Sequence, residues 1–120
     1  MNRSTDFQPV FERLRTILQP YARDLTITQD TNDSYYLEGP YSPKYKRDLF
    51  FGSVQIKKNY VSFYLMPVYM YPELLDAISP ELRKRMQGKS CFNFKQVDEM
   101  LLRELTSLTK RGFERFREET

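Results

Sequence analysis

Histidine is absent from the 120 residues of this chain, and cysteine occurs once, at Cys91. Without histidine, the chain cannot assemble a Ser-His-Asp or Cys-His catalytic centre, and it lacks the commonest zinc ligand. A lone cysteine cannot form an internal disulfide, which is typical of proteins from reducing compartments. No other grouping of acid, base and nucleophile stands out. The sequence therefore predicts a protein that is not an enzyme, and it indicates no cofactor or metal site.

Long apolar segments are also missing. No run approaches the roughly 20 apolar residues that a membrane span requires. The first residues, MNRSTDFQPVFERL, lack the apolar core of a secretory signal. We therefore predict a cytoplasmic protein without membrane contact. The net charge of +3, from 19 basic and 16 acidic residues, is too small to indicate a nucleic-acid partner by itself.

The stretch from Leu49 to Met66, LFFGSVQIKKNYVSFYLM, predicts two antiparallel strands joined at Lys58-Asn59. Side chains alternate between the two faces of a strand, so this turn sorts the hairpin into two sets. One set is apolar or small and predicts the core face: Gly52, Val54, Ile56, Val61, Phe63 and Leu65. The other set is mixed and predicts the second face: Phe51, Ser53, Gln55, Lys57, Tyr60, Ser62, Tyr64 and Met66.

The remaining patterns complete a single domain over residues 1–120. Helical periodicity predicts helices over about residues 6–19 and from about residue 96 onward, with short helices after Pro72 and Ser79. Strands are predicted at 25–29, 34–38 and 90–94, and a proline-containing loop at 39–48. Strands gathered in sequence favour an α+β fold: a single-layer antiparallel sheet of about five strands, with the N-terminal and C-terminal helices packed on one face.

Three segments resemble the YdhG-like domain, a family of small bacterial proteins of unknown function. They are the hairpin DLFFGSVQIKKNYVSFYLMP, the approach to a short aromatic strand MQGKSCFNF, and the closing helix VDEMLLRELTSL. Together they lie between Asp48 and about Phe113. The resemblance implies a compact α+β domain. For some members it also implies an iron-chaperone role like that of frataxin, carried by surface carboxylates.

Two groups of aromatic residues are candidates for a ligand-binding site. Tyrosines interleave with cations near the predicted loop, and such rings and charges can stack on bases and meet phosphates. The mixed hairpin face could bind a partner if it stays uncovered. Alternatively, the tyrosines pack the loop onto the sheet, or the loop and short helices cover this face. The candidate residues are Tyr36, Tyr41, Tyr45, Lys46, Arg47, Phe51, Tyr60, Tyr64, Met66 and Tyr69.

These patterns favour a non-enzymatic binding domain that contacts a small ligand or a protein partner through its tyrosine-rich face and loop. Two alternatives stay open. One is frataxin-like iron binding, carried by surface carboxylates. Separately, Asp30, Asp33 and Glu38 share one predicted hairpin and could offer oxygen ligands to a metal, although turn chemistry also explains the aspartates. The other is weak binding of single-stranded nucleic acid by the basic and aromatic loop. The sequence does not indicate an oligomeric state.

Overall fold

The computed structural model describes residues 7–119. Its elements, in chain order, are α1 (Gln8–Leu18), the 3₁₀ helix η2 (Gln19–Tyr21), β1 (Thr26–Asp30), β2 (Ser34–Ser42), β3 (Arg47–Ile56), β4 (Val61–Leu65), α2 (Met66–Met70), the 3₁₀ helix η3 (Pro72–Ala77), α3 (Pro80–Arg83), β5 (Met86–Gln87), β6 (Cys91–Phe94) and α4 (Glu99–Glu119). The helix start predicted at residue 6 lies outside the described residues.

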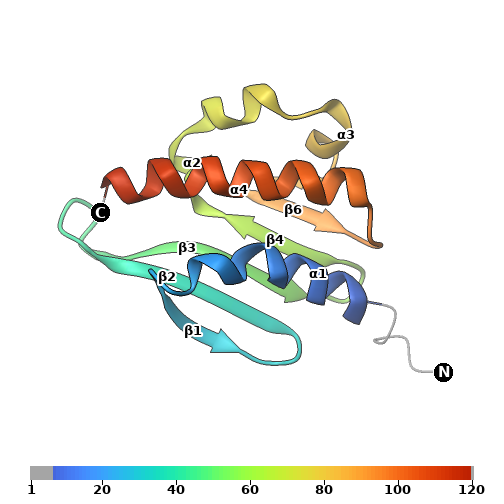
Figure 1. Ribbon diagram of the computed structural model, residues 1–120, viewed down its shortest axis with the longest axis horizontal. Coiled ribbons are helices and arrows are strands. Elements are labelled where there is room, and N and C mark those ends of the chain that lie inside the picture. Colours follow the sequence, from blue (N-terminus) through green and yellow to red (C-terminus); the bar gives the residue numbers. More distant parts are fainter. Residues whose placement is uncertain (1–6, 120) are drawn as a thin grey trace.

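The strands form one six-stranded antiparallel sheet in the order β1-β2-β3-β4-β6-β5. Helices α1 and α4 lie side by side across one face of this sheet (Figure 1). The predicted α+β architecture is therefore confirmed. The sheet has one strand more than predicted, because Met86 and Gln87 pair with β6 as the short strand β5.

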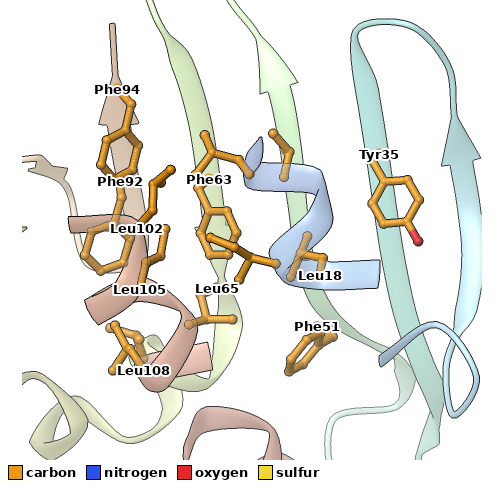
Figure 2. Close-up of a cluster of buried hydrophobic side chains, with 14 of the residues drawn as sticks. Leu18, Tyr35, Phe51, Phe63, Leu65, Phe92, Phe94, Leu102, Leu105 and Leu108 are labelled. Carbon is orange, nitrogen blue, oxygen red and sulfur yellow. The ribbon is translucent and has the colours of Figure 1, made fainter. Parts of the chain in front are cut away.

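The core lies between the two long helices and the sheet. The register of the central hairpin is the predicted one, since Val54 pairs with Phe63 and Ile56 pairs with Val61. Figure 2 shows leucines of α4 gathered against aromatic side chains of β4 and β6, with Leu18 of α1 beside them. The side chains that are fully buried here include Phe11, Leu14, Leu18, Leu37, Phe63, Leu65, Phe92, Leu105 and Leu108.

A bulge in β3 reverses the alternation of its first half. Leu37 of β2 pairs with Gly52, but the next residue, Glu38, pairs with Phe50, so Phe51 has no partner of its own. An unpaired extra residue shifts every preceding side chain to the opposite face. Phe51 therefore points into the core, where it is 0% exposed, and its assignment to the second face was wrong.

The loop predicted at 39–48 was also wrong in part, because β2 and β3 continue through it and leave only residues 43–46 as a turn. Pro40 had favoured the loop. However, β1 pairs with β2 only as far as Glu38, so Pro40 lies beyond the end of β1 and beside an irregularity in the β2–β3 pairing. A proline there interrupts no sheet hydrogen bond with β1. Lys46 closes the turn with φ 59°.

Two glycines lie at close or unusual backbone positions in the second half of the chain. Helix α4 is continuous through Gly112. A Cβ at Gly112 would lie 3.0 Å from the Cβ of Pro67 in α2, a helix that the sequence did not predict. Gly88 lies between β5 and β6 with φ 77°. None of the helices within residues 7–119 combines the length and apolarity that a membrane crossing demands.

Candidate functional site

The open face is the side of the sheet opposite to α1 and α4. Here one row of side chains crosses three strands, because Tyr36 of β2 pairs with Ser53 of β3, and Ser53 pairs with Tyr64 of β4. The bulge adds Phe50 to this face, and its ring lies 5.9 Å from that of Tyr36, between centroids. Aromatic residues thus surround one small serine.

The polar hollow lies over this row and has a volume of about 430 Å³. Its lining is of three kinds: the aromatic residues Tyr36, Phe50 and Tyr64, the neutral polar residues Ser53 and Gln55, and the charged residues Glu38, Arg47, Asp48 and Lys57. The aromatic and neutral residues are half-buried or buried, whereas Arg47, Asp48 and Lys57 are exposed. Charges of both signs therefore stand at the rim, whereas the fourth charged residue, Glu38, is half-buried like Tyr36 and Tyr64.

The apolar hollow adjoins the polar one and measures about 360 Å³. The two share Phe50 and Arg47. The rest of its wall comes from the 43–46 turn, the start of β3 and the helix α2, as Tyr45, Leu49, Met66, Tyr69 and Met70. Methionine side chains are flexible and adapt to varied apolar surfaces. A ligand with a polar and an apolar part could occupy both hollows at once.

Hydrogen bonds satisfy most of the polar groups on the open face. Gln55 donates its Nε2 to the Tyr36 hydroxyl, and Lys57 donates its Nζ to Gln55 Oε1 at 2.5 Å. Ser62, one strand away, donates its hydroxyl to Asn93 Oδ1 at 2.7 Å. Ser53 differs, because its Oγ is buried and has no hydrogen-bond partner among the described residues. Such a group is unusual in a folded protein and costs about 1–3 kcal/mol.

The Tyr64 phenol stays neutral in this environment. Burial raises the pKa of Tyr64 above its usual value, and the neighbouring Cys91 raises it further. Cys91 is itself buried and donates its thiol to Asn93 Oδ1 at 3.3 Å. The phenol hydroxyl is therefore a neutral donor and acceptor at the wall of the polar hollow.

The structure brings together part of the predicted site. Tyr36, Arg47 and Tyr64 line the polar hollow, and Tyr45, Arg47, Met66 and Tyr69 line the apolar one. The other candidates line neither hollow. Tyr41 is 59% exposed, Lys46 closes the 43–46 turn, and Tyr60 lies in the hairpin turn, where its carbonyl accepts from Lys57 N–H at 2.8 Å. Phe51 lies in the core.

Sequence reasoning missed Phe50 and Met70. The strict alternation assumed for β3 placed Phe50 on the core side, and the bulge that moves it depends on the pairing with β2. Met70 was missed because α2 was not predicted. Ser53 and Gln55 were already assigned to the correct face.

Iron binding was the metal alternative. Within residues 7–119, the His, Cys, Asp and Glu side chains form no group of three or more that could hold a metal ion. Glu38 lies at the polar hollow, whereas Asp30 pairs with Arg15, with 3.5 Å between Oδ1 and Nη1. Asp33 accepts a hydrogen bond from the Thr31 hydroxyl within its turn. These carboxylates therefore act as separate groups.

Comparison of this chain with protein-family models, with curated proteins and with solved structures gave no match.

Proposed function

We propose that this chain is a non-enzymatic, cytoplasmic binding domain whose open face holds a small ligand or the side chain of a protein partner. The observation that carries this proposal is the pair of adjoining hollows that meet at Phe50 and Arg47 on a sheet face away from the long helices. Concave surfaces with apolar walls and a few convergent polar groups are the usual form of ligand sites. The resemblance to the YdhG-like domain agrees with a binding role and stays a prediction.

The frataxin-like and nucleic-acid alternatives have less support. The described carboxylates do not gather into a metal-binding group. Tyr41 and Tyr45 are exposed near lysines, as stacking on single-stranded bases requires. However, Asp48 stands beside Arg47 and Lys57 at the exposed rim of the polar hollow, which weakens its attraction for phosphates. Both alternatives stay predictions.

Replacing Tyr64 should weaken ligand binding, whereas replacing Tyr41 should not. A library of aromatic fragments, screened by thermal shift and followed by calorimetry, supplies the ligands. Tyr64→Ala removes a ring from the wall of the polar hollow, so the affinity of each confirmed fragment should fall about tenfold. Tyr41→Ala is the matched control, because Tyr41 is exposed and lines neither hollow.

Circular dichroism of both variants establishes that each is folded before affinities are compared. Equal affinities for wild type and Tyr64→Ala would contradict the proposal. Loss of binding in Tyr41→Ala alone would move the contact to the end of β2, next to the 43–46 turn, as the nucleic-acid alternative requires.

A further inference from the structure

Ser53 lies at the floor of the polar hollow. It is the small member of the row Tyr36–Ser53–Tyr64, and neighbouring strands lie about 4.8 Å apart, so the two tyrosine backbones are about 10 Å from each other. Ser53 is nevertheless only 1% exposed, so neighbouring side chains close over it. Turning the half-buried Tyr64 ring outward, a change of rotamer, would admit a flat group between the two tyrosines.

Within residues 7–119, the Ser53 hydroxyl lacks a hydrogen-bond partner, whereas the hydroxyl of the nearby Ser62 has one. Both serines are on the open face, and both are 1% exposed. Ser62 donates to Asn93, but Ser53 has no partner in the described part of the chain. A ligand atom that hydrogen-bonds Ser53 Oγ would satisfy a buried group, and this gain is made only when the ligand is present. The unpartnered hydroxyl therefore points to a ligand with a polar edge.

The distribution of charge in the polar hollow disfavours binding of a ligand whose edge is charged. Its deeper groups, the side chains of Ser53, Gln55 and Tyr64, are neutral, and the pKa of Tyr64 is raised. The cations Arg47 and Lys57 and the acid Asp48 are exposed at the rim, and the carboxylate of Glu38 is half-buried. An ionised group at the floor would lose its water without meeting an opposite charge there, which is strongly unfavourable. A neutral edge avoids this cost.

Resting on the ligand-binding role proposed above, we infer that the polar hollow takes an uncharged heteroaromatic ring whose edge hydrogen-bonds Ser53 Oγ. The rings of Tyr36, Phe50 and Tyr64 provide flat partners for it. An apolar substituent on the same ring extends past Phe50 into the apolar hollow, where Met66 and Met70 receive it.

Four probes with similar bicyclic skeletons test this inference by calorimetry. Quinolin-2-one is uncharged with a donor and an acceptor on its edge, naphthalene has no polar edge, quinoline-2-carboxylate is an anion, and 2-(aminomethyl)quinoline is a cation. We expect quinolin-2-one to bind at least about tenfold more tightly than the other three, as expected for one hydrogen bond and an avoided buried charge.

Two serine variants separate the ligand contact from a structural role. Ser53→Ala should weaken quinolin-2-one binding about tenfold, while the unliganded variant melts at the wild-type temperature or above it, since an unsatisfied hydroxyl is removed. Ser62→Ala should melt lower than wild type, because it breaks the bond to Asn93, and should bind quinolin-2-one normally.

Different results would contradict the inference about the ligand and the proposed binding role. Equal binding of all four probes, or an unchanged affinity in Ser53→Ala, overturns the inference and leaves the binding role intact. The same holds if the fragment screen yields ligands that depend on Tyr64 while quinolin-2-one does not bind. Absence of any Tyr64-dependent ligand, in the screen and among the probes, overturns both proposals.

Discussion

Phe51→Ala should lower the free energy of unfolding by about 4 kcal/mol, whereas Phe50→Ala should lower it by far less. The Phe51 ring is fully buried and lies 5.1 Å from the ring of Phe116, 5.6 Å from that of Phe113 and 5.7 Å from that of Tyr21, between centroids. Its removal leaves a cavity between β3 and α4. Urea denaturation of the two variants measures the difference.

Phe50→Ala is the matched control, since it makes the same change at the neighbouring residue, whose side chain lies on the opposite face of the sheet. Phe50 is half-buried and shares an aromatic contact with Tyr36. Its loss should weaken fragment binding, because Phe50 lines both hollows. Equal destabilisation by the two substitutions, or a larger effect of Phe50→Ala, would refute the placement of the bulge.

Gly52→Ala should be the second strongly destabilising change, with a loss of about 3 kcal/mol in the free energy of unfolding. A Cβ at Gly52 would lie 2.9 Å from the carbonyl oxygen of Tyr64 and 3.2 Å from Cδ2 of Leu18. The first neighbour is backbone of the paired strand, so β3 and β4 or helix α1 must move. Thermal and urea unfolding of the variant test this expectation.

Gly88→Asn is the comparison for Gly52. Gly88 has φ 77° but no atom within 4 Å of its Cβ position, and asparagine accepts this left-handed backbone better than most residues do. We expect a loss below about 1 kcal/mol. If Gly52→Ala were as mild as Gly88→Asn, α1 would not pack against β3 as closely as described.

The fold was predictable where one periodic pattern decides a whole element. Val54 and Phe63 are buried in the predicted register because a slip by one residue would place Gln55 in the core. The bulge was not predictable, since Phe50 and Phe51 are chemically identical and the extra residue is defined only by the pairing of β3 with β2. Pro40 suggested a loop for a similar reason. A strand can contain this proline only because β1 ends before it, and the sequence does not show where β1 ends.

The candidate site was likewise predictable only in part. Tyr64 was assigned to the face that the helices leave uncovered, although the sequence left open whether that face would be covered. Tyr36 was grouped with the tyrosines near the loop, and only the pairing of β2 with β3 places it beside Ser53. Met70 depended on helix α2, which the sequence did not predict. The isolation of the Ser53 hydroxyl depends on atomic positions that no sequence pattern encodes.

Amide chemical-shift mapping of ¹⁵N-labelled protein, titrated with quinolin-2-one or the tightest fragment, tests most directly whether the open face is the binding surface. We predict that the largest shifts fall on the row that joins Tyr36, Ser53 and Tyr64, with smaller ones around α2. The helical side offers a competing hollow of about 310 Å³ between α1 and α4, beside the ion pair of Arg13 and Glu99. Shifts confined to that hollow, with β3 unaffected, would contradict the account.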